Sequence, residues 1–418
     1  MYIELIIVAF LCLATCFAPV RYTAVLLGIL LPIDVIRVVT PVALDVARYG
    51  LLALLVLRLA PEPRRGPRVM FALSMSGLIV VSVFGLVKGA SGESYSLVRG
   101  VVGLASTIGG VLVARRMSVH RHVLVGFVLG SVASACDVCL QVAGLPYLGV
   151  ETLYGFRYSG FSLKSTALAP LLALAIVLVA SSWLWTGAKS HRFVGVLRVV
   201  MLAPLGFALY ASQGRGGLVS LILAGVFLTA LRFRGHPGRV ITLLGLTLVA
   251  AYYFRAQITD LFVRPSENDL SNGRGQLNEE ALRAFARDPL FGATPSEIPL
   301  LNPHTPLLTF AIEAGLLGLA AALVLMIALL RVVSAKGPSS AHVPAVVRAA
   351  AVVMLVTSFL EPDGFYVGLG RVVLLGIVLT NVAPTEEPTT VDDGARRRDA
   401  VRSRRYYSGS GHRARQGS

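Results

Sequence analysis

The residue with the clearest capacity for binding chemistry is Arg215, in the turn Ser212-Gln-Gly-Arg-Gly-Gly217. Glycines on both sides let the backbone bend sharply and expose the guanidinium group. A hydrophobic segment begins at Leu218, so the free N–H groups and the positive dipole end of a helix point at the same place. A guanidinium beside a helix start is a good phosphate site, and the alternative is an arginine that reaches for lipid headgroups.

A second arginine stands in a glycine turn further along the chain. Arg274 lies in Ser271-Asn-Gly-Arg-Gly275, within the long polar connection that runs from Arg255 to Pro303. Arg264 lies in the same connection and is the reserve candidate for the same role. For Arg274 the alternative is an ordinary solvated loop arginine.

His304 is the candidate general base. It opens a hydrophobic segment in Asn302-Pro-His-Thr-Pro306. A neutral imidazole near pH 7 can accept a proton from a sugar hydroxyl, and the alternative is a surface histidine at a helix start. The other six of the seven histidines fall in connections or a tail that we expect to be cytoplasmic.

The composition decides what kind of protein must position these residues. Of the 418 residues, 55% are hydrophobic and 14% are charged, against roughly 25% charged in a soluble domain. Mean hydropathy is +0.74. A soluble enzyme is excluded, and the chain is expected to be an all-α polytopic membrane protein. The net charge of +16 is attributed to cytoplasmic loops and anionic lipid rather than to nucleic acid.

Hydrophobic runs predict a bundle of about 12–13 transmembrane helices across residues 1–382. A helical span needs about 20 mainly apolar residues, and the first two runs are short enough to form one interrupted element. The runs lie near 3–18, 22–39, 42–60, 69–87, 98–114, 123–143, 166–186, 194–211, 217–231, 240–258, 305–331, 344–361 and 366–382.

Charge asymmetry predicts the orientation of the bundle. Alternate connections carry sixteen Lys and Arg residues, whereas the others hold few. By the positive-inside rule the rich set is cytoplasmic, together with the C-terminus, and residues 256–303 form one long extracytoplasmic loop. Residues 383–418 are predicted to be a basic, disordered cytoplasmic tail.

Local signals place a short amphipathic helix in the outer loop. Asn278 is the expected N-cap, and Asp288-Pro289 is expected to end the helix. Its apolar side lies either on the membrane surface or back against the bundle. Elsewhere, Gly126-x-x-x-Gly130 is a candidate for close helix packing. Cys136 and Cys139 are interpreted as packing residues rather than a redox or zinc pair, and Asp137 between them is expected to face the protein interior or water.

The order of these residues resembles the O-antigen ligase and O-antigen polymerase family of membrane glycosyltransferases. The most specific match is His304-Thr305, nine residues, then Gly315-Leu-Leu-Gly318. Asp288-Pro-Leu-Phe-Gly292 resembles the short turn that precedes this pattern in the family. The motifs cover about residues 205–320, and the hydropathy profile covers the whole chain.

The resemblance implies a fold of the GT-C type in the cytoplasmic membrane, with the active site on the outer face. It implies an inverting glycosyltransferase that takes a glycan from an undecaprenyl-diphosphate donor. Arg215 and Arg274 would bind the donor diphosphate, and His304 would deprotonate a hydroxyl on a glycan or glycolipid acceptor. The arginines would neutralise the leaving diphosphate, so neither a metal nor a cofactor is implied.

Three alternatives stay open at the level of sequence. Ligase and polymerase share donor and site and differ only in the acceptor, for which we find no signature. A lipid-linked glycan transporter would show paired charges within spans in two matching halves. Asp34/Arg37 and Asp45/Arg48 are such pairs, but both lie near one end of the chain. An inactive membrane scaffold would leave the three polar turn residues without a role.

The predicted topology can be tested by cysteine labelling. A cysteine placed at Ser271 should react with a membrane-impermeant reagent added from outside, whereas one placed at Gly235 should be protected. The physical reason is that one set of connections carries sixteen basic residues, whereas the alternate set holds few. Protection at position 271 with labelling at position 235 would reverse the orientation.

Overall fold

The structure is a computed structural model, and the part of the chain that it describes is almost entirely helical. No strand occurs in that part, where an isolated bridge joins Ile36 and Val39. The described residues are 15, 17–34, 36, 39–59, 69–90, 94–149, 158–162, 164–181, 191–233, 274–294, 296–301, 303, 305–334, 345–361 and 369–380, with a few isolated positions between 238 and 253.

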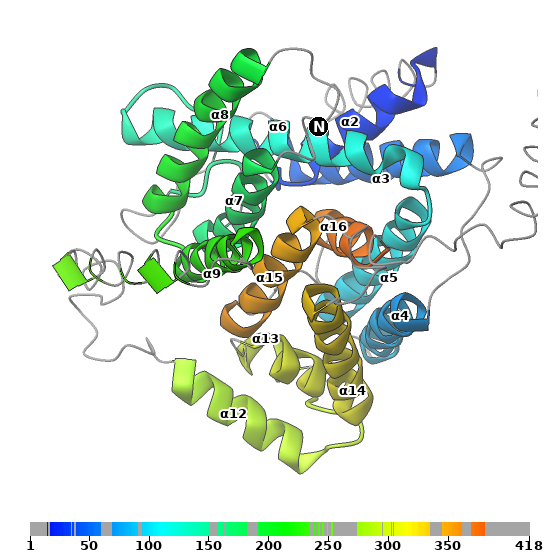
Figure 1. Ribbon diagram of the computed structural model, residues 1–418. Coiled ribbons are helices and arrows are strands. Elements are labelled where there is room, and N and C mark those ends of the chain that lie inside the picture. Colours follow the sequence, from blue (N-terminus) through cyan, green and yellow to red (C-terminus); the bar gives the residue numbers. More distant parts are fainter. Residues whose placement is uncertain are drawn as a thin grey trace, which may run out of the picture.

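Eleven of the thirteen predicted spans coincide at least in part with helices of these residues (Figure 1). The other two, 3–18 and 240–258, fall largely outside the described residues. The eleven helices are α2 (Val20–Leu30), α3 (Pro41–Arg58), α4 (Val69–Ala90), α5 (Ser94–Ala114), α6 (Met117–Val142), α7 (Ser165–Ala180), α8 (His191–Ala211), α9 (Arg215–Arg232), α14 (Pro306–Ser334), α15 (Ala345–Leu360) and α16 (Leu369–Thr380).

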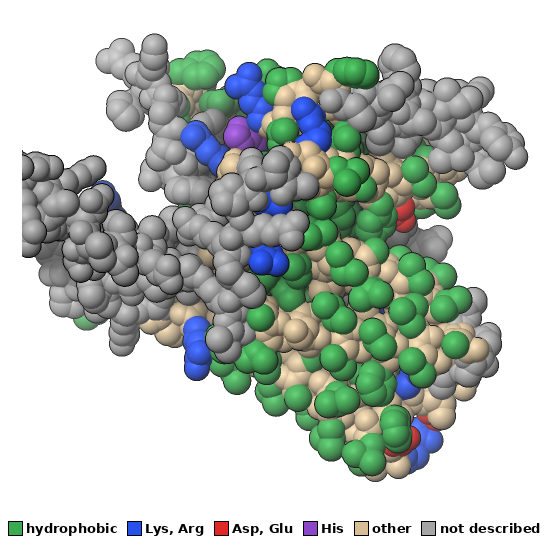
Figure 2. Space-filling view, turned by 90° about the vertical axis from the view of Figure 1, so that its right-hand side faces the viewer, with side chains coloured by type: hydrophobic (Ala, Val, Ile, Leu, Met, Phe, Trp, Pro, Cys, Tyr) green, Lys and Arg blue, Asp and Glu red, His purple; other side chains and the backbone are tan. Residues whose placement is uncertain are grey.

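Six of the described helices, α4, α5, α6, α8, α9 and α14, are long and apolar enough to cross a membrane. Four shorter apolar helices, α2, α7, α15 and α16, pack with them. Figure 2 shows a broad hydrophobic surface on one side of the molecule, with charged groups mainly towards its edges. Exposed Val80, Val101 and Leu323 belong to this type of surface. These are the features of a polytopic membrane protein.

The predicted span 22–39 is wrong in its second half. Helix α2 ends at Leu30, and Pro32 follows in a turn. Leu31 before it still has helical backbone angles, but Pro32 has no N–H with which to continue the helical hydrogen bonds. The next helix starts with Pro41 at its first position, and the Thr40 hydroxyl accepts a hydrogen bond from Ala43 N at 3.4 Å. This start therefore has the usual N-cap chemistry.

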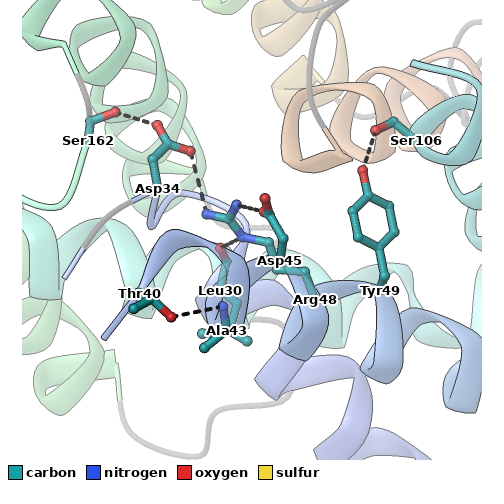
Figure 3. Close-up of polar contacts among 9 residues, drawn as sticks. All are labelled: Leu30, Asp34, Thr40, Ala43, Asp45, Arg48, Tyr49, Ser106 and Ser162. Carbon is teal, nitrogen blue, oxygen red and sulfur yellow. Dashed lines mark hydrogen bonds and ion pairs between the residues drawn. The ribbon is translucent and has the colours of Figure 1, made fainter. Parts of the chain in front are cut away.

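A buried arginine joins α2, α3 and the segment before α7 (Figure 3). Arg48 donates through Nε to Leu30 O at 3.0 Å and pairs with Asp45 at 2.9 Å and with Asp34 at 3.5 Å. Ser162 Oγ donates to the other oxygen of Asp34 at 2.9 Å. The predicted Asp45/Arg48 pair is present, and Asp34 also pairs with Arg48. Arg37 lies outside the described residues.

Glycines bring α2 and α6 into close contact, as the Gly126-x-x-x-Gly130 pattern predicted. A Cβ on Gly28 would lie 2.9 Å from the Cα of Gly126, and a Cβ on Gly126 would collide with Val25 O. Gly130 in turn packs against Ile29 O. Small residues let the two backbones approach, which increases van der Waals contact where lipid provides no hydrophobic drive between helices.

Basic side chains bind the carbonyl ends of helices at the side predicted to be cytoplasmic. Arg348 donates to Val333 O near the end of α14 at 2.8 and 3.0 Å, and Arg58 donates to Thr15 O and Ala18 O at 3.0 and 2.5 Å. The last carbonyls of a helix lack internal partners and carry the negative dipole end. Some of the basic residues on this side therefore stabilise the helix bundle directly.

Asp137 faces the protein interior, in agreement with the prediction. It is 3% exposed and accepts hydrogen bonds from Leu148 N at 2.7 Å, Gly149 N at 3.1 Å and the Gln141 amide at 2.8 Å. These donors satisfy its carboxylate and tie the following turn to α6. Cys136 and Cys139 are free thiols rather than a disulfide.

The α2–α6 contact gives a stability prediction. Gly126→Ala should lower the free energy of unfolding by about 1–3 kcal/mol, because the added methyl group overpacks the crossing. Gly206→Ala on α8 is the control, since nothing lies within 4 Å of a Cβ there. It should leave stability unchanged or raise it by up to about 1 kcal/mol, because alanine has the higher helix propensity. Thermal unfolding in detergent measures both, and equal effects would contradict the close contact.

Candidate functional site

The Arg215 turn differs from its prediction in where it bends. Gln213 has the positive φ, 48°, whereas Gly214 has φ −81° and precedes the helix as its N-cap. Helix α9 begins at Arg215 itself rather than at Leu218. The arginine is half-buried and lies in the first helical turn. The backbone N–H groups of that turn and the arginine therefore share one end of α9, as an anion site requires.

The glycines of this turn are needed for close packing more than for bending. A Cβ on Gly214 would collide with Ala169 of α7, and one on Gly217 would lie 2.6 Å from Ala169 O. On the α15 side, a Cβ on Gly216 would lie 2.5 Å from an oxygen of Glu361. The turn is therefore packed closely between α7 and the end of α15.

The second feature is a break in α14 at Ala314 and Gly315. Their backbone angles leave the helical region, with φ 61° and ψ −145° at Gly315. The turn Asp288-Pro-Leu-Phe-Gly292 packs into the break and supplies the missing hydrogen bonds. Leu316 N donates to Pro289 O at 2.8 Å, and Ala293 N donates to Ile312 O at 2.8 Å. The two segments that carry the family resemblance thus form one structural unit.

Three ionisable residues from separate helices surround the break. Lys88, near the end of α4, donates to Ala293 O at 2.8 Å and to Ile312 O at 3.4 Å. Arg99 of α5 pairs with Glu313 at 2.6 Å. The side chain of Glu313 is 11% exposed, so this ion pair is largely removed from solvent. The sequence-based selection missed these residues, although the signal was present, because Glu313 is an ionisable residue inside a predicted span.

The glycines of the break do not act as predicted. The i,i+3 spacing of Gly315 and Gly318 places both on one face of a helix and predicts that a neighbouring helix approaches closely there. Instead, Gly315 adopts a positive φ and packs on Leu290 O, and Gly318 packs on Phe310 O of its own helix. Gly292, with φ 79°, fits against the carbonyl groups on the other side of the break. Only glycine adopts these backbone angles without strain.

The predicted amphipathic helix of the outer loop is present as α12 (Arg274–Arg287). It ends before Asp288-Pro289 as expected, but it begins at Arg274, so the predicted N-cap Asn278 is wrong. A further helical turn places Leu277 half-buried, which outweighs the local capping preference. Arg274 is therefore the first residue of a helix.

Helix α12 packs back onto the bundle beside α14 (Figure 1). Buried Ala281 and Ala284 form a small apolar core with Ile312 of α14 and Ile298 of α13 (Ile298–Leu301). At its end, Arg287 pairs with Glu297 at 3.0 Å. Hydrogen bonds from the hydroxyl and N–H groups of Thr294, together with Arg287, lower the pKa of the Glu297 carboxyl.

Two predicted site residues, His304 and Arg264, lie outside the described residues, as does the side chain of Arg274. The residues that flank His304 in the chain are described. Pro303 is buried, and the Thr305 hydroxyl accepts a hydrogen bond from Leu308 N at 3.4 Å as the N-cap of α14. This start has proline at its first helical position, a favourable arrangement.

Comparison with known proteins adds no relative. No protein-family model matches the chain, and no curated protein matches it. Among the described residues, no three His, Cys, Asp or Glu side chains are grouped so that they could hold a metal ion.

The ion pair at the break gives the next prediction. Arg99→Met and Glu313→Leu should each lower the free energy of unfolding by about 1–3 kcal/mol. We expect less than the usual cost of breaking a fully buried pair because the Arg99 side chain is 25% exposed. The double variant should lower the free energy of unfolding by less than the sum of the two single effects, and the difference should be at least about 1 kcal/mol.

The exposed pair Arg283–Glu279 is the matched control for this cycle. Its side chains are 73% and 59% exposed. A cycle of Arg283→Met and Glu279→Leu should therefore give a coupling of at most about 0.5 kcal/mol. Denaturant unfolding in detergent measures both cycles, and equal couplings would mean that the Arg99–Glu313 pair contributes no more than a surface contact.

Proposed function

We propose that this protein transfers a glycan from an undecaprenyl-diphosphate donor to a hydroxyl acceptor at the outer face of the cytoplasmic membrane. One observation chiefly supports the proposal. The turn at residues 288–292 and the segment that ends in Gly315-Leu-Leu-Gly318, which carry the family resemblance, fold together into the break of α14. A chance resemblance would give no reason for the two segments to meet.

The proposed reaction is a direct displacement at the anomeric carbon. The acceptor oxygen attacks that carbon, the bond to the donor phosphate oxygen breaks, and undecaprenyl diphosphate leaves with the electron pair. His304 takes the hydroxyl proton, and Arg215 and Arg274 neutralise the charge that develops on the diphosphate. The first turn of α9 adds backbone N–H groups beside Arg215. The configuration at the anomeric carbon is inverted.

The acceptor separates the two forms of this proposal. A ligase would transfer the glycan once to a different molecule, and a polymerase would extend another copy of the repeat unit. Vesicles supplied with an undecaprenyl-diphosphate oligosaccharide distinguish them by their products. A ladder of longer glycans indicates a polymerase, and a single transfer to a second acceptor indicates a ligase.

A lipid-linked glycan transporter is the second candidate. The buried Arg48 with its partners Asp34 and Asp45 is the type of intramembrane charge that transporters use. The same vesicle experiment decides between the classes. Movement of the intact donor across the membrane without a new glycosidic bond would support transport and exclude the transferase.

Arg215→Lys should reduce turnover by about 10- to 100-fold although the charge is kept. Lysine is a point charge and cannot make the bidentate contact of a guanidinium with a diphosphate, so each lost charged hydrogen bond costs about 1–3 kcal/mol. Transfer rates in proteoliposomes measure this, with Arg283→Lys on the exposed face of α12 as the control. Near-normal turnover in both Arg215→Lys and Arg274→Lys would exclude the diphosphate role and leave Arg264 as the candidate.

His304→Ala should leave donor binding intact and reduce turnover by about 10²–10⁴-fold, the contribution of a positioned general base. Donor binding and single-turnover transfer are measured separately. Loss of donor binding with unchanged turnover of bound donor would make His304 a diphosphate ligand. Full activity would transfer the base role to an outer-loop glutamate, among which Glu267, Glu279, Glu280 and Glu297 are the candidates.

A further inference from the structure

A buried carboxyl group lies against the first turn of α9. Glu361 directly follows α15, is 4% exposed, and keeps its backbone N–H bonded to Thr357 O at 2.9 Å. A Cβ added to Gly216 would lie 2.5 Å from Glu361 Oε1 and 2.9 Å from its Cγ. Gly216 follows Arg215 in the chain, and its lack of a side chain makes room for the carboxyl group of Glu361.

The helix dipole favours a carboxyl group at this position. Burial of an ionised or polar group is costly unless donors or opposite charge compensate. The first turn of a helix offers N–H groups without internal partners and a positive dipole end. Gly216 belongs to that turn, so Glu361 faces the positive end of α9.

On its other side the turn packs against α7. There, Gly214 and Gly217 pack on the backbone and methyl group of Ala169. A change at Glu361 therefore alters the charge beside the turn, whereas the contacts of these two glycines with Ala169 are steric.

We infer that Glu361 is a positioning residue for Arg215. Its carboxyl group holds the first turn of α9 in place, so that Arg215 and the turn's N–H groups keep the arrangement that binds a diphosphate. The inference rests on the proposed function for its ligand. Glu361 acts through the turn and does not itself contact the donor.

The placement of Glu361 can be tested without any activity. Gly216→Ala should lower the melting temperature by about 2–4 °C in the wild-type background and by much less in a Glu361→Ala background, because the collision partner has been removed. Gly225→Ala on the same helix is the control, since nothing lies within 4 Å of a Cβ there. Its effect should be the same in both backgrounds. Equal effects of Gly216→Ala in both backgrounds would overturn the placement.

The role of Glu361 is tested by binding of undecaprenyl diphosphate to the full-length protein in nanodiscs. Glu361→Gln should weaken binding about tenfold, which corresponds to about 1.4 kcal/mol, with little change in melting temperature. The Arg215→Lys, Glu361→Gln double variant should bind no more weakly than Arg215→Lys alone, because both changes act on one contact. Ser358→Ala is the control, since Ser358 is buried in α15 and donates to Met354 O of the same helix.

The outcomes separate this inference from the proposed function. Weaker binding in Glu361→Gln together with no glycan transfer by the wild type would keep the inference and reject the transferase. Unchanged binding in Glu361→Gln with normal transfer would reject the inference alone. Tighter binding would show that the carboxyl group competes with the diphosphate, which also overturns it. Failure of the wild type to bind undecaprenyl diphosphate would reject both.

Discussion

The break in α14 is the constraint on which the arrangement of α12, α13 and the turn at residues 288–292 depends. A helix that is interrupted within an apolar bundle leaves N–H and C=O groups that no water can satisfy. Here the helical bond between Leu316 N and Ile312 O is replaced by one bond from Leu316 N to Pro289 O and one from Ala293 N to Ile312 O. The break and the turn therefore require each other, and neither is expected to be stable alone.

The charged residues around the break also serve the need of its buried backbone groups for hydrogen-bond partners. Lys88 adds a donor to the exposed carbonyl groups, and the Arg99–Glu313 pair lies beside them. These residues come from α4, α5 and α14, so they connect the break to the transmembrane helices. Because α12, which begins with Arg274, packs on α14 through Ile312, the same unit holds α12 relative to the bundle.

The Arg215 turn is positioned by close backbone packing at its glycines rather than by backbone hydrogen bonds to a distant segment. Its glycines leave no space for side chains between α7, α9 and the end of α15, and the carboxyl group of Glu361 occupies the position that a side chain on Gly216 would need. Close backbone approach thus sets the position of the α9 N-terminus. In the proposed reaction that end of α9 and Arg215 act together on one anion, so their rigid placement matters more than the flexibility of the turn.

The sequence by itself determined the membrane class, most helix positions, the α2–α6 glycine contact and the end of α12. All of these depend on hydrophobic runs, prolines and small residues, which act locally along the chain. Tertiary structure alone decided the break at Gly315, the start of α12 and the burial of Glu361 against Gly216. Gly315-Leu-Leu-Gly318 has the spacing of a helical contact face, and only the turn at residues 288–292 makes it a break. The physical reason is that satisfaction of buried backbone and charged groups depends on partners that are distant in sequence, such as Lys88 and Ile312, and no local pattern encodes them.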